Sequence, residues 1–173
     1  MNRGDVVRHA LGILDQYGLA DLSMRRLAGD LGVQASALYW HVANKQTLLA
    51  AVADELLREL QSPALSGDWR RDASAASHAL RSTLLSHRDG AEVVATAHAL
   101  GLGDVDPSAA FRAAMGEHAD AAGVLLVYVL GYVQSEQLRG DAVRLGVAEP
   151  DMDEGFSAGI DVILAGIGAR VGA

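Results

Sequence analysis

The chain contains no cysteine, so disulfide frameworks and thiolate metal sites are excluded, which fits a reducing cytoplasm. It has only 3 prolines among 173 residues, and no stretch alternates strictly between apolar and polar side chains. Half of the residues are nevertheless apolar, which is enough for one or two modest cores. This combination predicts an all-α protein.

Long hydrophobic runs are also missing. The longest apolar run, 121–133, has 13 residues, whereas a helix needs about 20 to span a bilayer. The first residues include Arg3, Asp5 and Arg8, where a signal peptide would have a basic start followed by an apolar run. We therefore expect a cytoplasmic protein with no membrane partner.

Positive charge is scarce, and the net charge of −8 is unusual for a protein that binds nucleic acid. The acidic excess is uneven, because residues 1–60 hold 6 basic and 7 acidic side chains, whereas residues 61–173 hold 8 and 15. The N-terminal third can therefore carry a local positive face. The acidic remainder favours solubility and opposes indiscriminate binding to DNA.

Residues 23–42 show the pattern of a helix-turn-helix, in which two short helices are joined at a glycine. Ser23 is a suitable N-cap for the first helix, and Gly32 can adopt the left-handed conformation of a sharp turn. Ser36 is expected to cap the second helix. An ordinary helical hairpin produces the same spacing, so the pattern alone leaves DNA binding and simple packing about equally open.

Consecutive aromatic side chains at Tyr39, Trp40 and His41 cannot all face the core of the second helix. They suit packing along a sugar-phosphate backbone and can donate hydrogen bonds to phosphate oxygens, which favours DNA binding. The candidate DNA-binding residues lie on the two helices and just beyond them: Arg25, Arg26, Ala35, Ser36, Ala37, Tyr39, Trp40, His41 and Lys45.

Three segments resemble the tetracycline repressor (TetR) family of bacterial transcription regulators. Residues 38–49, with Leu-Tyr-Trp-His-Val followed by Asn-Lys and Leu-Leu, are similar to its DNA-reading segment. Residues 85–91 resemble part of its ligand-binding core, and 156–168 resemble its last dimerisation helix. The resemblance implies a three-helix helix-turn-helix domain over 1–45 and a helical ligand-binding and dimerisation domain over 46–173, with a connecting helix at 45–61. It implies neither an enzyme nor a cofactor.

The resemblance further implies a homodimer joined by a four-helix bundle, to which each subunit contributes two helices. Packing within one chain is about as compatible with the apolar pattern of the terminal helices, expected near 119–138 and 154–171. Glycines in the last helix each cost about 1 kcal/mol relative to alanine, which suggests close approach by another helix. Residues 139–153 are expected to be a mobile linker. The candidate interface residues are Leu126, Val129, Leu130, Val133, Ile160, Ile163, Leu164 and Ile167.

In the tetracycline repressors, polar side chains including histidines hold the drug and its magnesium ion. The matching positions here fall on or near Gln61, Ala76 and Val94, so the metal-holding imidazole and the amide are missing. We therefore expect no metal site and a largely apolar organic effector, bound between the connecting helix and the core helices. The candidate ligand-binding residues are Gln61, Ala76, Leu80, Val94, His98, Leu100 and Met115.

Catalytic motifs are absent from the sequence, which has no nucleophile elbow, zinc-binding helix, P-loop or complete dinucleotide fingerprint. The segment 87–90, His-Arg-Asp-Gly, is better explained as a helix end at which Gly90 turns the chain than as a charged triad. We therefore expect a ligand-responsive repressor that binds a palindromic double-stranded operator. Two alternatives stay open: a dimeric DNA-binding module without small-molecule input, and a helical enzyme with an unrecognised site.

Overall fold

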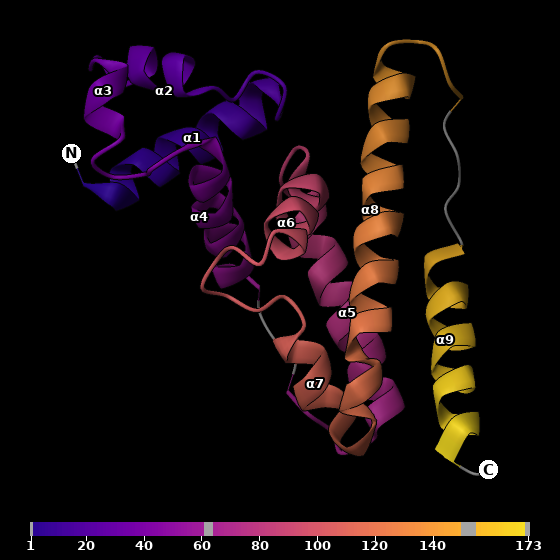
Figure 1. Cartoon of the computed structure of the whole chain (residues 1–173). Coiled ribbons are helices and arrows are strands. Elements are labelled where there is room, and N and C mark those ends of the chain that lie inside the picture. The colour runs from indigo at the N-terminus through magenta and orange to yellow at the C-terminus, as the bar shows by residue number, and fades with distance from the viewer. Residues whose placement is uncertain (1, 61–63, 150–154, 172–173) are drawn as a thin grey trace. The chain divides into compact units, whose positions relative to one another are not determined.

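The computed structural model describes residues 2–60, 64–149 and 155–171 (Figure 1). Within these ranges every regular element is a helix, which confirms the predicted all-α class. The chain forms two compact units. The first combines Met1–Glu59 with Thr83–Asp106, and the second combines Leu60–Ser82 with Pro107–Ala173.

The first unit begins with α1 (Arg3–Tyr17), α2 (Met24–Asp30), α3 (Ala35–Leu38) and α4 (Lys45–Arg58). Asn2 and Asp5 form a capping box at the start of α1, where each side chain accepts a hydrogen bond from the other residue's backbone N–H. Gly18 ends α1 with φ 88. One apolar face of α1 is buried: Val6, Ala10, Ile13 and Leu14.

The connecting helix α4 is enclosed within the first unit by α1 and by α6 (Gly90–Ala99). Asn44 and Thr47 form a second capping box that defines where α4 begins. The side chains of Leu48, Val52 and Leu56 on α4 are fully buried. Helices α4 and α6 therefore pack closely against each other.

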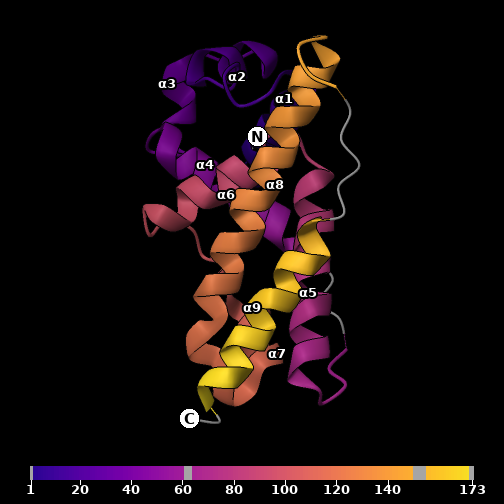
Figure 2. The same cartoon turned by 90° about the vertical axis from the view of Figure 1, so that its right-hand side faces the viewer.

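The second unit contains α5 (Trp69–Leu85), whose last three residues belong to the first unit. It continues with α7 (Ala109–Met115), the 3-10 helix η1 (Gly116–Ala121), α8 (Ala122–Arg144) and α9 (Gly155–Val171). Figure 2 shows α8 and α9 side by side. By length and composition alone, the stretch Ala109–Arg144 could cross a membrane, but half of its most apolar window is buried, as in a core helix.

Several predicted boundaries differ from the observed ones. The helix predicted near 119–138 starts at Ala122, after η1, and continues to Arg144. Most residues of 134–144 are good helix formers, which outweighs the cost of Gly140. Part of the expected linker 139–153 is therefore helical, and its residues 150–153 lie outside the described residues.

The turn between α5 and α6 corrects the role predicted for Gly90. The left-handed residue is Asp89, with φ 55, while Gly90 is the first residue of α6. A Cβ atom at Gly90 would lie 2.7 Å from the carbonyl oxygen of Leu84. Glycine is therefore needed at position 90 for close approach to the end of α5, and not to turn the chain.

Candidate nucleic-acid interface

The helix-turn-helix is formed by α2 and α3. The Ser23 hydroxyl caps α2 as predicted, accepting a hydrogen bond from the backbone N–H of Arg26 at 3.2 Å. Gly32 adopts φ 66 in the turn, the left-handed conformation that glycine permits. Leu27 and Leu38 are fully buried, one on each helix. The motif predicted for residues 23–42 is confirmed.

The second helix of the motif is shorter than predicted and begins earlier. Gln34, not Ser36, is the N-cap, and its side chain makes no capping hydrogen bond. Because α3 ends at Leu38, the residues Tyr39, Trp40 and His41 lie in the turn that follows, not on a longer helix. The preference for serine at an N-cap is only statistical, and here it gave the wrong start.

The aromatic side chains in this turn point to solvent to different degrees. Trp40 is 89% exposed and Tyr39 is 53% exposed, while His41 is half-buried. A tryptophan with that exposure contributes almost nothing to the core of its own chain. Its ring is therefore available to a partner.

The two neighbouring arginines of α2 have different surroundings. Nη1 of Arg26 lies 2.8 Å from Oδ1 of Asp21, and its guanidinium carbon lies 3.7 Å from the centre of the Tyr17 ring. Arg25 is exposed and has no ion pair or hydrogen bond from its side chain within the described parts of the chain. Arg26 is thus held by α1 and by the loop before α2, whereas Arg25 can reach an outside molecule.

The remaining candidate residues offer small, mostly polar groups. Ser36 is exposed, Ala35 and Ala37 are half-buried methyl groups, and Lys45 is the half-buried first residue of α4. Sequence reasoning missed Gln34, whose amide is exposed at the start of α3. The signal that could have found it is its position two residues after the turn glycine.

The exposed groups around α3 suit nucleic acid better than catalysis. A guanidinium, an amide, hydroxyls and an ammonium are donors for phosphate oxygens and base edges, and the aromatic rings can pack on sugars. Among the described residues, no three histidine or acidic side chains are grouped so that they could hold a metal ion.

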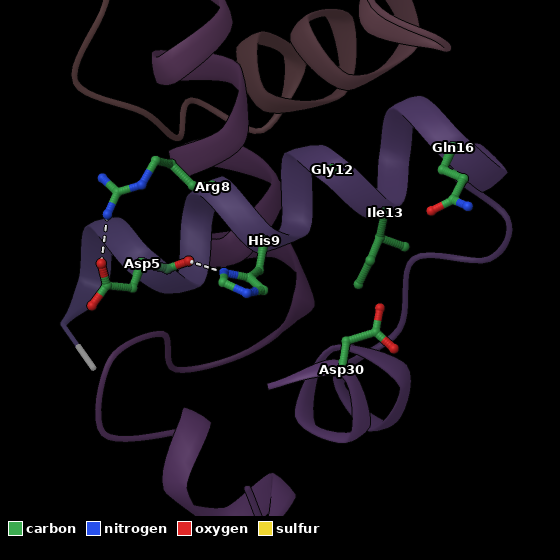
Figure 3. A pocket seen from close by; sticks show the side chains of 7 residues that line it. All are labelled: Asp5, Arg8, His9, Gly12, Ile13, Gln16 and Asp30. Carbon is green, nitrogen blue, oxygen red and sulfur yellow. Dashed lines mark hydrogen bonds and ion pairs between the residues drawn. The ribbon is translucent and has the colours of Figure 1, made fainter. Parts of the chain in front are cut away.

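A pocket of about 440 Å³ lies on α1, close to the end of α2 (Figure 3). Asp5 pairs with Arg8 at one side of it, and Nδ1 of His9 lies 3.0 Å from the carbonyl oxygen of Asp5. This charged lining is unlike the apolar site expected for an effector, and it includes no predicted ligand-binding residue. The lining residues are Asp5, Arg8, His9, Gly12, Ile13, Gln16 and Asp30.

The predicted ligand-binding residues are divided between the two units. Ala76 and Leu80 on α5 and Met115 at the end of α7 are buried in the second unit. In the first unit Val94 is buried on α6, whereas His98 and Leu100 are exposed. Gln61 lies outside the described residues. The ligand site stays a prediction.

The apolar stripes predicted as the dimer interface are instead packed inside the second unit, the alternative that their pattern left open. Seven of the eight side chains are buried, and Ile163 is half-buried, so the stripes have little surface to offer a second subunit. Periodicity detects the strongest apolar stripe of a helix, and that stripe forms the core of its own chain. The buried seven are Leu126, Val129, Leu130, Val133, Ile160, Leu164 and Ile167.

A second, weaker stripe faces outward on the same two helices. On α8, Val124, Val127 and Leu138 are 53%, 68% and 62% exposed, and Val162 on α9 is 72% exposed. Small exposed residues continue each stripe along the same helix face, each three or four residues from another member of the stripe: Gly131 on α8, and Ala158, Ala165 and Ala169 on α9.

Two glycines of α9 accommodate side chains of the same chain. The Tyr128 hydroxyl lies over Gly159 and donates a hydrogen bond to the carbonyl oxygen of Phe156 at 3.0 Å. The guanidinium of Arg70 lies against Gly168, and a Cβ atom at either glycine would collide with these groups. The close approach at these two positions therefore comes from side chains of α8 and α5 in the same chain, and it does not require a second subunit.

Comparison with known proteins agrees with this geometry. Residues 6–52 match the family of bacterial regulatory proteins of the tetR family, and residues 62–144 match the tetracycline repressor-like C-terminal domain. The class A tetracycline repressor from transposon 1721 of Escherichia coli is 32% identical over 193 residues, covering 95% of this chain and 89% of that protein. The matched family and this relative are regulators of transcription.

Solved structures are similar to this protein over almost the whole chain. Mycobacterium smegmatis BioQ is 38% identical, with a TM-score of 0.90 and 98% of both chains covered. BioQ bound to its natural double-stranded DNA operator gives a TM-score of 0.84, covering 96% of this chain and 98% of that one. A TetR variant from Acinetobacter baumannii AYE, in complex with minocycline, is 31% identical with a TM-score of 0.78 and 98% of both chains covered. The chain belongs to the TetR family of DNA-binding transcriptional regulators.

Proposed function

We propose that this regulator is a repressor that binds a near-palindromic operator as a homodimer and leaves it when a small, largely apolar molecule binds. The observation that carries the DNA-binding part is the group of exposed side chains around α3, above all Trp40 and Arg25. BioQ, similar over nearly the whole chain, has been solved with its double-stranded operator. Because operator DNA lies in the cytoplasm, the protein acts there.

The homodimer is supported by the outward stripe of α8 and α9. Exposed valines at 124, 127 and 162, interspersed with glycine and alanine, form an apolar surface that pairing with a second copy would cover. Two-fold symmetry would then present two copies of α3 to major grooves about 34–36 Å apart, or a multiple of that spacing. We therefore revise the interface to the exposed faces of these helices.

An effector of apolar character is supported by the residues at the expected polar anchor positions. Ala76 and Val94 are buried and apolar, and so are the candidate lining residues Leu80 and Met115. Minocycline is bound by a similar protein from Acinetobacter baumannii, but we infer that this chain does not use magnesium-tetracycline.

A route from effector to DNA is available through α4. The buried Asp54 carboxylate of α4 accepts hydrogen bonds from the backbone N–H groups of Asp104 and Val105, each at 2.9 Å. A shift of α6 and the loop after it would therefore pull on the connecting helix. To change the bound population from 99:1 to 1:99, the effector must prefer the released state by about 5.5 kcal/mol.

Selection of duplexes from a random DNA library tests the proposed function. We expect an inverted repeat whose half-sites are centred one helical turn, or a multiple of it, apart. Recovery of no enriched sequence would contradict the proposal. The selected duplex then serves in a displacement screen, where apolar compounds should release it and magnesium-tetracycline should not. Release by no compound at all would favour the module without small-molecule input.

A further inference from the structure

His87 joins three elements of the first unit. It lies in the turn between α5 and α6, and its Nδ1 is 3.0 Å from Oδ1 of Asp15, near the end of α1. Its Nε2 is 3.1 Å from Oε2 of Glu59, the residue that ends α4. The imidazole therefore bridges α1, which packs against the first helix of the DNA-binding motif, and the far end of the connecting helix.

Both of these contacts need an N–H donor from the ring, because ionised carboxylates can only accept hydrogen bonds. A neutral imidazole has one N–H, so it can satisfy Asp15 or Glu59 but not both. The imidazolium ion has two, and it also carries the charge that two carboxylates attract. The bridge is therefore complete only when His87 is protonated.

Charged side chains from three elements surround His87. Asp15 comes from α1 and Glu59 from α4, while Arg88 and Asp89 belong to the same turn as His87. The Asp89 carboxylate accepts a hydrogen bond from the backbone N–H of Leu19 at 2.7 Å, so the turn is tied to the end of α1 a second time. Arg88 and Asp89 both lie so close to Gly18 that a Cβ atom there would meet them within 3.0 Å.

Partial burial of His87 opposes its protonation, but hydrogen bonds and charge from Glu59 and Asp15 outweigh it, so the pKa of His87 is raised above its usual value. A raised pKa in the folded state means that the bridge contributes fully below about pH 6.5 and is lost as the pH rises through the raised value.

We propose that protonated His87 fixes the orientation of the DNA-binding motif on the connecting helix, so that the affinity for operator DNA falls as this imidazole loses its proton. His87 is a positioning residue here, since it acts through α1 and α4 and not by touching DNA. The inference rests on the proposed DNA binding. Because Asp15 and Glu59 are 41% and 51% exposed, we expect a modest effect of about threefold to fivefold in Kd.

The test compares duplex affinity between pH 6 and pH 8.5 for the wild type and His87→Gln, using the selected operator. The variant should bind about threefold to fivefold more weakly at pH 6 and equally well at pH 8.5. Any pH effect that does not involve His87 is common to both proteins and cancels in the ratio of their affinities. His78→Gln replaces an exposed histidine of the second unit and should keep the wild-type profile.

An independent readout follows the ring resonances of His87 by NMR in the free protein. Its pKa should fall in Asp15→Asn and in Glu59→Gln, while both variants stay folded by circular dichroism. Parallel affinity profiles for wild type and His87→Gln, or a His87 titration that neither variant shifts, would overturn the inference. If no duplex is bound at any pH, the proposed function fails, and the NMR titration still decides whether the bridge exists.

Discussion

Arg25 and Arg26 are adjacent in the sequence and identical in chemistry, yet their surroundings give them different roles. Arg26 is engaged by Asp21 and by the face of Tyr17, whereas Arg25 extends from α2 without such a partner in the described chain. From the sequence, both arginines were predicted to bind DNA. The contacts that distinguish them depend on how α1 packs against α2, which the sequence pattern does not show.

Replacing Arg25 with alanine should reduce sequence discrimination. A guanidinium that reads a guanine edge contributes about 1–3 kcal/mol to binding of the correct base. Lys45→Ala should instead weaken binding to all duplexes similarly and flatten its salt dependence, as expected for a phosphate contact. Anisotropy titrations on operator and random DNA measure both effects. Equal losses on the two duplexes for Arg25→Ala would reverse the assignment.

Removing the carboxylate of Asp54 should destabilise the protein without touching the DNA-binding surface. Asp54→Ala leaves the N–H groups of Asp104 and Val105 without their acceptor, at a cost of about 1–3 kcal/mol in the free energy of unfolding. Asp30→Ala, at an exposed position of α2, should stay within about 0.5 kcal/mol. Urea denaturation measures both, and similar values for the two variants would contradict this role of Asp54.

At the scale of elements, helix ends were predicted correctly where several local sequence signals agree. The cap at Ser23 and the turn at Gly32 were predicted correctly, because the capping residue, the glycine and the apolar spacing agree there. The start of α3 and the role of Gly90 were not, because they depend on backbone contacts that a sequence pattern does not encode. The stripes of α8 and α9 were found, but periodicity cannot tell an internal face from an external one.

Glycine positions should respond to alanine according to what surrounds them. Gly159→Ala in α9 forces the new methyl group against the Tyr128 ring and hydroxyl, so the melting temperature should fall. Gly12→Ala in α1 meets nothing within 4 Å and should stabilise the fold by about 0.5–1 kcal/mol through helix propensity. Calorimetry of the two variants measures both effects. If both variants are destabilised, the expected gain from helix propensity at Gly12 is contradicted.

For the whole molecule, substitutions on the exposed and the buried face of α8 should have different effects, one on dimerisation and the other on folding. Val127 is 68% exposed, so Val127→Asp should leave the subunit folded while introducing a charge into the proposed interface. Val129 is fully buried, and Val129→Asp should unfold the subunit, because an unpaired charge in the core costs several kcal/mol. Circular dichroism with size-exclusion chromatography distinguishes these results. A dimeric Val127→Asp variant with normal operator affinity would place the interface elsewhere.

Sedimentation velocity of the protein, alone and with the selected operator duplex, tests most directly whether a homodimer binds the operator. We expect a dimer at micromolar concentration and a complex of two chains on one inverted repeat, with markedly weaker binding to a duplex that carries a single half-site. A monomer that binds neither duplex, or one that binds the half-site as tightly as the full operator, would contradict it.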